Sequence, residues 1–159
     1  MNTLQRQLFD LQDLKYREFH SKLMPGIAKE TIIGIRTPVL RNFVNEFRKT
    51  DEAKLFLAEL PHQYYEENNI HMMLIAQIRD YETCIAEVNR FLPYINNWAT
   101  CDLPQPKCFG AHKKELLQEV HKWIASNETY TIRYGIVPLP RMLFEMLQTG
   151  HAAVCSCLR

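Results

Sequence analysis

Apolar residues recur three and four positions apart along most of the chain, and this spacing is the strongest constraint on its fold. One series covers residues 4–23, another covers 37–47, and later series cover 70–78, 84–92 and 116–124. Because a helix turns once every 3.6 residues, this spacing places the apolar side chains of each segment on one face. The sequence therefore predicts an all-α fold of about seven helices, each roughly 10–18 residues long.

Proline, glycine and hydroxyl side chains indicate where the first helices begin and end. The first helix is expected to run through residues 4–23 and to end at Pro25 and Gly26. Thr37 is expected to be the N-cap of the next helix, because its hydroxyl can accept a hydrogen bond from a backbone N–H that lacks a partner. Pro38 then lies in the first turn, where a missing N–H costs nothing.

Further boundaries complete this helical scheme. A helix over residues 51–60 ends at Pro61, and Ser126 or Asn127 is expected to cap the last helix. Only residues 31–35 look strand-like, and they are too few to build a sheet. Short links favour antiparallel neighbours, so the chain forms either a helix bundle or an α-solenoid. No sequence repeat of fixed period is visible, and both architectures stay open at this point.

The composition is that of an ordinary globular domain. The 159 residues, 47% hydrophobic and 23% charged, are enough for one hydrophobic core, so residues 1–159 are expected to form a single domain. No apolar run approaches the roughly 18–20 residues that a membrane span requires. The five cysteines are odd in number and lack the spacing of a disulfide framework. These features predict a cytoplasmic protein with reduced thiols and no membrane partner.

The net charge of +1 limits any nucleic-acid surface to a local patch. A dedicated nucleic-acid binder usually carries a clear basic excess, because contacts between Lys or Arg and phosphate dominate its affinity. Candidates for such a patch are Lys107, Lys113 and Lys114. Glutamates follow them in the sequence, and the alternative is that these lysines belong to an ordinary solvated helix face.

Trp98 and Asp102 form the most distinctive pair in the sequence. They are four residues apart, so on a helix they share one face. A large π surface beside a carboxylate can hold a cationic, flat or sugar-like group. The competing interpretation is a tryptophan buried for packing, with an exposed aspartate near the start of a helix.

Arg133 is a long cationic side chain in the otherwise apolar stretch 130–136. Such a side chain either extends to solvent or is held by an anion. The anion could be a carboxylate in a structural ion pair or a phosphate of a nucleic acid, and the sequence leaves both open.

The sequence gives little support to metal chemistry or to other common catalytic motifs. Cys101, Cys108, His112 and His121 do not have the spacing of a zinc site. Glycine-rich nucleotide-binding motifs and the serine-hydrolase motif do not occur. We therefore expect no metal and no cofactor.

Six stretches, taken in order and spacing, resemble the bacterial AlkD-like DNA alkylation repair glycosylases. The first three are Leu11–Arg17, Ile33–Arg41 and Tyr64–Asn69, and the other three are Phe91–Asp102, Trp123–Ser126 and Tyr130–Ile136. Together they span roughly residues 4–137. Each stretch alone is weak, whereas the ordered set is fairly specific.

The resemblance implies an α-solenoid of HEAT-like antiparallel helical repeats whose concave face cradles double-stranded DNA. It also implies hydrolytic release of N3- or N7-alkylated purines without metal or cofactor. By motif, Trp98 corresponds to the family's active-site tryptophan, Asp102 to its catalytic aspartate and Arg133 to its DNA-gripping arginine. Lys107, Lys113 and Lys114 would then be further DNA contacts.

The resemblance is expected to fade after Ile136. Pro138 and Pro140 interrupt what would be a continuing helix, since a proline in a helix interior costs about 3 kcal/mol. Residues 138–159 are thus expected to form a divergent tail, as in a C-terminally truncated member of the family. Two alternatives to the enzyme follow: a non-catalytic HEAT-repeat module that binds DNA or protein, and an inactive fragment of such an enzyme.

Overall fold

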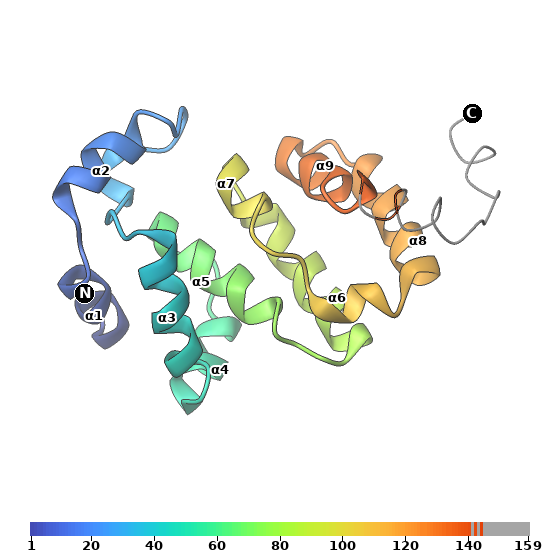
Figure 1. Cartoon of the computed structure of the whole chain (residues 1–159), viewed down its shortest axis with the longest axis horizontal. Coiled ribbons are helices and arrows are strands. Elements are labelled where there is room, and N and C mark those ends of the chain that lie inside the picture. The colour runs from blue at the N-terminus through green and yellow to red at the C-terminus, as the bar shows by residue number, and fades with distance from the viewer. Residues whose placement is uncertain (141, 143, 145–159) are drawn as a thin grey trace.

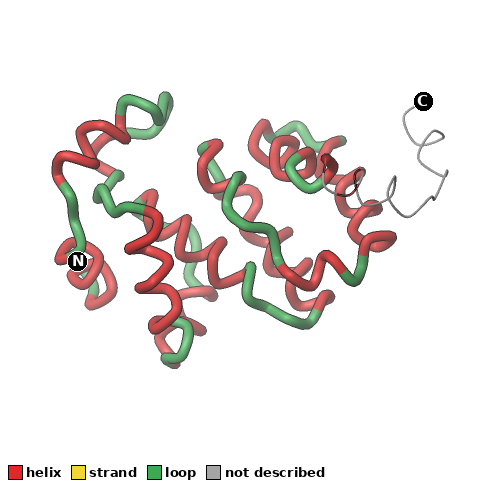
Figure 2. Tube along the Cα trace, in the orientation of Figure 1, coloured by secondary structure: helices red, strands yellow, loops and turns green. Residues whose placement is uncertain are grey.

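The fold was obtained as a computed structural model, which describes residues 1–140, 142 and 144. Within these residues all regular structure is helical and no strand occurs, as Figure 2 shows, so the all-α prediction is confirmed. The α-helices of this part of the chain are α1 (Thr3–Asp10), α2 (Leu14–Ser21), α3 (Thr37–Phe47), α4 (Asp51–Ala58), α5 (Tyr65–Ile75), α6 (Tyr81–Phe91), α7 (Trp98–Cys101), α8 (Lys113–Ile124) and α9 (Thr129–Ile136). Short 3₁₀ turns occur at Lys29–Thr31, Leu92–Tyr94 and Lys107–Gly110.

The N-terminal helices lie towards one end of the long axis of the molecule and the C-terminal helices towards the other (Figure 1). The helices α1 and α2 lie at one end, and α8 and α9 lie at the other. Among the helices given above, α3, α5, α6 and α8 have 11 or 12 residues and fall within the predicted range of roughly 10–18, whereas the other five have 8 residues or fewer. The apolar spacing in the sequence continues through turns where one helix ends and the next begins, so it does not mark those helix ends.

The prediction of one N-terminal helix over residues 4–23 is wrong. The chain leaves the helix after Asp10, and Asp13 adopts an extended conformation and caps α2 by accepting a hydrogen bond from the Tyr16 N–H at 2.9 Å. Aspartate competes with the helix in this way because its side chain can satisfy a backbone donor at a helix start. The later apolar residues of the predicted stripe are exposed, namely Leu14, Phe19 and Leu23.

The start of α3 differs from the prediction by one position. Arg36 occupies the N-cap position without a capping side-chain bond, and Thr37 is the first helical residue, with Pro38 in the first turn as expected. The predicted stripe is confirmed, because Leu40 and Val44 are buried and pack with the neighbouring helices.

The central helix α5 joins two hydrophobic cores. All of its residues are buried, so it has no solvent face. Ile70 and Leu74 pack in a core with α1, α3 and α4, whereas Met72 and Ile75 pack in a second core with α6, α8 and α9. Each core relies on α5 for part of its apolar surface, and segments on either side of α5 are therefore held in fixed relation.

The last described α-helix is seated closely against α8. A Cβ atom added to Gly135 would lie 3.0 Å from the Trp123 Cβ and 3.2 Å from the Ile124 Cγ1, so a larger residue here would require α8 to give way by a few tenths of an ångström. The N-cap position is Glu128, not the predicted Ser126 or Asn127; the Ser126 hydroxyl oxygen instead accepts a hydrogen bond from the Glu128 N–H before the helix starts. This packing sets where α9 presents Arg133.

Candidate active site

The one-turn helix α7 brings Trp98 and Asp102 together. The side chain of Asn97 caps α7, accepting a hydrogen bond from the Thr100 N–H at 2.8 Å. Asp102 lies just past the last helical residue, and its N–H donates to the Trp98 carbonyl oxygen at 3.1 Å. The two residues are thus one turn apart, as their spacing predicted, although the helix consists of that single turn.

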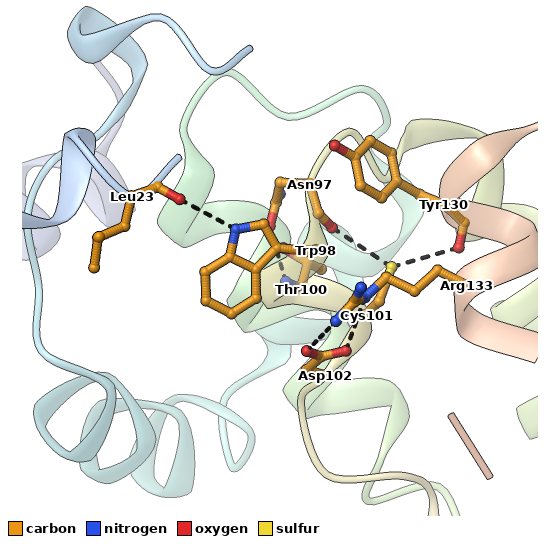
Figure 3. A network of polar contacts seen from close by, with 8 residues as sticks. All are labelled: Leu23, Asn97, Trp98, Thr100, Cys101, Asp102, Tyr130 and Arg133. Carbon is orange, nitrogen blue, oxygen red and sulfur yellow. Dashed lines mark hydrogen bonds and ion pairs between the residues drawn. The ribbon is translucent and has the colours of Figure 1, made fainter. Parts of the chain in front are cut away.

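Arg133 of α9 donates two parallel hydrogen bonds to the carboxylate of Asp102. The Arg133 Nε lies 3.0 Å from Asp102 Oδ1, and Nη2 lies 2.6 Å from Oδ2. Figure 3 shows the arginine reaching from α9 to meet this carboxylate, close to the indole of Trp98. The side chains of Arg133 and Asp102 are 45% and 36% exposed, and their hydrogen bond raises the pKa of the guanidinium. The pair is therefore open to a ligand from solvent.

Trp98 is exposed, whereas the other tryptophan is buried. Trp98 retains 37% of its accessible surface and Trp123 only 3%, so the interpretation of Trp98 as a core residue is wrong. The Trp98 indole N–H donates to the Leu23 carbonyl oxygen at 3.2 Å (Figure 3). The segment that follows α2 thus touches the site and fixes one edge of the indole ring, a contact that the sequence did not indicate.

A buried thiol links α7 to α9 behind this site. The Cys101 Sγ lies 3.5 Å from the Asn97 carbonyl oxygen and 3.4 Å from the Tyr130 carbonyl oxygen. Burial raises the pKa of Cys101 to about 12, so the thiol stays protonated at neutral pH and is a poor nucleophile. Its role in this position is to pack the two helices that carry Asp102 and Arg133.

A basic groove of about 750 Å³ opens between α3, the turn after α5 and the segment that follows Asp102. Among its lining residues are four cationic side chains and no Asp or Glu; these four are Arg41, Arg48, Arg79 and Lys107. Val44, Met73 and Ile78 supply apolar wall. Such a surface favours anions such as phosphate.

Only Lys107 of the three predicted lysines lines this groove. Lys113 lines a smaller neighbouring hollow of about 460 Å³, which Lys107 also borders, and Lys114 is exposed on α8. The three arginines of the groove were not predicted; the available signal was the spacing of Arg41 on α3 and Arg48 at its C-cap, which are seven residues apart.

The described residues were also considered as possible metal ligands and membrane-spanning helices, with the following outcome. Among residues 1–140, 142 and 144, no three side chains of His, Cys, Asp or Glu are arranged to hold a metal ion. In the same part of the chain, no helix combines the length and the apolar character of a bilayer-spanning segment. The tail cysteines, Cys155 and Cys157, lie outside the described residues.

Comparison of the sequence with known proteins identifies a family that it matches. A family model described as DNA alkylation repair enzyme matches residues 4–142. The match passes the predicted limit at residue 137, so the resemblance extends beyond Pro138 and Pro140. No curated protein and no solved structure was found to match the chain. Because the family model covers most of the chain, the protein belongs to the DNA alkylation repair enzyme family.

Proposed function

We propose that this protein is a DNA glycosylase that hydrolyses the N-glycosidic bond of N3- or N7-alkylated purines in duplex DNA. The observation that carries the proposal is the convergence of Trp98, Asp102 and Arg133 at one exposed site, although they come from two helices. The family match supports an activity in DNA repair, and the site supplies the chemistry.

The proposed reaction needs only one carboxylate. A purine alkylated at N3 or N7 is already cationic, so it leaves as a neutral base and requires no general acid. An ordinary glycosidase, by contrast, uses a pair of carboxyl groups, one of which protonates the leaving group. Asp102 alone is therefore sufficient at this site, and no second acid has to be found beside it.

Asp102 would stabilise the positive charge that develops on the deoxyribose and would orient the attacking water. Charge held in place in this manner is usually the largest catalytic contribution, and loss of one such group costs on the order of 3–4 kcal/mol. Trp98 would pack against the same sugar, where its π face attracts the developing cation. Its exposed ring is available for that contact.

Arg133 would hold the phosphate next to the lesion. Its guanidinium donates one hydrogen bond to each oxygen of Asp102. A guanidinium carries five N–H donors in a planar fork, and it can therefore bind a phosphate while it keeps one contact to the carboxylate. A phosphate that shares the guanidinium would weaken the ion pair with Asp102. The negative charge of the carboxylate would then be less neutralised and would stabilise a cationic sugar more strongly.

The basic groove is the surface that we propose for the DNA backbone. Its four cations are concentrated on one side of a chain whose net charge is only +1, so phosphate contacts would be local to this face. We further propose that the helices form a HEAT-like α-solenoid within a single domain over residues 1–159, whose concave face carries the groove. The spread of the helices along the long axis, from the N-terminal ones at one end to the C-terminal ones at the other, supports this arrangement (Figure 1). The buried free thiols Cys84, Cys101 and Cys108 fit a cytoplasmic setting.

Base release from methylated duplex DNA tests the proposal. The wild-type protein is incubated with DNA that contains 7-methylguanine or 3-methyladenine, and the free base is measured beside the Asp102→Asn variant. Release by the wild type that is lost in the variant supports the glycosylase. If the folded wild-type protein releases no base, the catalytic proposal is wrong.

A non-catalytic binding module is the second candidate. It is favoured by the same ion pair, because a carboxylate with both oxygens taken by Arg133 also has the geometry of a purely structural contact. Under this alternative, duplex DNA binds with equal affinity to the wild type and to Asp102→Asn, and no base is released. Binding that is insensitive to salt would instead indicate a protein partner.

A further inference from the structure

The first turns of α5 contain buried polar residues for which the proposed reaction gives no role. Glu66 and Asn69 are 0% and 5% exposed, in a helix that is otherwise packed between two cores. A buried polar side chain is costly unless it forms hydrogen bonds, so the partners of these residues indicate why they are there. They are three positions apart and therefore lie on the same side of α5.

Glu66 holds the segment that precedes α3. Its two carboxylate oxygens accept hydrogen bonds from three consecutive N–H groups, those of Ile33 at 2.8 Å, Gly34 at 2.7 Å and Ile35 at 3.2 Å. Gly34 has a φ of +94°, and a Cβ there would lie 2.4 Å from the Arg17 Cβ, so the segment lies tightly against α2.

This segment in turn carries α2 and the residue that contacts the indole. The Asp13 N–H donates to the Gly34 carbonyl oxygen at 2.8 Å, and Arg17 Nε donates to the Ile32 carbonyl oxygen at 2.7 Å. Shortly after α2 ends, Leu23 presents the carbonyl oxygen that accepts from the Trp98 indole N–H. One edge of the indole is thereby tied to α5 through Glu66.

Asn69 supports α7, the helix that carries Trp98, from the interior of the protein. Its Oδ1 accepts a hydrogen bond from the Thr100 hydroxyl at 2.8 Å, and Thr100 is completely buried in the middle of α7. A helix of one turn has no stability of its own, since nucleation is unfavourable. The orientation of α7 therefore depends on the Asn97 cap and on this bond to Asn69.

We propose that Asn69 and Thr100 are positioning residues for Trp98 and Asp102, an inference that rests on the proposed function of the site. Neither side chain reaches the surface where substrate would bind. Their hydrogen bond fixes the turn whose two ends carry the indole and the carboxylate. Displacement of a catalytic group by about 1 Å can cost a hundredfold in rate, so a buried bond that orients α7 acts on the chemical step and leaves DNA affinity nearly unchanged.

The decisive substitutions are Thr100→Val and Thr100→Ser. Valine keeps the shape of threonine and removes the hydroxyl, whereas serine keeps the hydroxyl and removes a methyl group. Val120→Ala is the control for lost stability, because Val120 is a fully buried core residue on α8 and takes no part in the hydrogen bond between Asn69 and Thr100. Asn69→Ala removes the same bond from its other end and serves where Thr100→Val does not fold.

The kinetic readout separates positioning from stability. Single-turnover release of 7-methylguanine is expected to fall about tenfold or more in Thr100→Val, with the Kd for the same duplex within about twofold of wild type. Thr100→Ser and Val120→Ala should release base at nearly the wild-type rate. Equal rates in Thr100→Val and wild type, or equal losses in the valine and serine variants, would overturn the inference.

A fluorescence readout tests the inference without any catalytic activity. Iodide quenches exposed indoles, so quenching reports Trp98 and leaves the buried Trp123 nearly silent. Thr100→Val and Asn69→Ala are expected to change the quenching constant of Trp98, whereas Thr100→Ser and Val120→Ala should match wild type. If wild type releases no base, the proposed function fails, and this comparison still decides whether Asn69 and Thr100 position the indole. An unchanged quenching constant in both Thr100→Val and Asn69→Ala would then contradict the inference.

Discussion

Arg133 and Asp102, 31 residues apart in sequence, form a bidentate ion pair at the surface, with N–O distances of 3.0 and 2.6 Å. Exposed ion pairs contribute about 0–1 kcal/mol to stability, so stability alone is a weak reason for this geometry. The pair holds the carboxylate in one orientation beside Trp98. Substitution of either residue should therefore affect the proposed reaction much more than folding.

The first prediction concerns the shape of the cation at position 133. Arg133→Lys keeps the positive charge but cannot donate to both oxygens of Asp102 in parallel. We expect the single-turnover rate of base release to fall about tenfold or more, while the free energy of unfolding changes by less than about 1 kcal/mol. Chemical denaturation beside the release assay measures both. A variant that matches wild type in rate would show that the fork geometry is unimportant.

The second prediction concerns the basic groove. Arg48→Gln removes one of its four cations, and the slope of log Kd for duplex DNA against log salt concentration should become shallower by about 0.9 for each phosphate contact that is lost. Arg6→Gln on α1 is the matched control, because Arg6 is exposed and does not line the groove. Titrations at several salt concentrations measure the slope. Equal slopes for the two variants would exclude Arg48 from the DNA surface.

The third prediction is a loss of stability in acid, caused by two neighbouring histidines, His62 and His71, each of which stacks on a phenylalanine ring. His62 Nε2 and His71 Nδ1 lie 2.8 Å apart, and burial is the main cause that lowers their pKa values, to about 4 for His62 and about 3 for His71. Both values lie below that of an unfolded chain, about 6.5, so the unfolded state binds more protons between these values. The contribution of these histidines to the free energy of unfolding should be fully present above about pH 6.5. It should fall as the pH decreases towards 4, by up to roughly 2–3 kcal/mol for each histidine.

Urea denaturation at a series of pH values measures this fall. His62→Gln cannot titrate and should show a clearly smaller decrease between pH 6.5 and 4.5 than wild type, whereas His121→Gln, on the exposed face of α8, should show the same decrease. The comparison of variants cancels the contribution of buried carboxylates such as Glu66, whose pKa burial raises. Parallel curves for wild type and His62→Gln would contradict the assignment.

The fourth prediction concerns the carboxylate that holds residues 33–35. Glu66→Gln replaces one acceptor oxygen with an NH₂ group that faces backbone N–H donors, and we expect a loss of about 3 kcal/mol in the free energy of unfolding. Glu46→Gln is the control, since Glu46 is exposed and pairs only with Lys49 at the surface, where the loss should stay below about 1 kcal/mol. Similar losses in the two variants would show that the three hydrogen bonds contribute little.

Sequence spacing predicted those parts of the site that depend on one turn of helix or on one unusual residue. Trp98 and Asp102 were found by their separation of four, and Arg133 by its charge within an apolar stretch; the open question of its anion is answered by Asp102. Glu66 and Asn69 gave no such signal, because α5 is buried on every side and has no apolar stripe against which a polar residue stands out.

Helical spacing of apolar residues also predicted the all-helical fold, but it did not predict where individual helices begin and end. Helical spacing continues across residues 11–13, where the side chain of Asp13 caps the second helix and its backbone N–H donates to the Gly34 carbonyl oxygen, contacts that the spacing does not reveal. The basic groove escaped prediction because its arginines come from α3 and from the turn after α5, and only the packing of these segments brings them together.

The most direct measurement of the central claim is the single-turnover rate of 7-methylguanine release from duplex DNA by wild type, Asp102→Asn and the surface control Asp51→Asn. Asparagine keeps the size of aspartate and one of its two acceptor oxygens but has no charge to offer a developing cation. We predict release by the wild type and by Asp51→Asn, and a rate at least about a hundredfold lower in Asp102→Asn with DNA affinity retained. Equal rates in the two aspartate variants, or no release by the folded wild-type protein, would contradict the claim that Asp102 drives glycosidic bond cleavage.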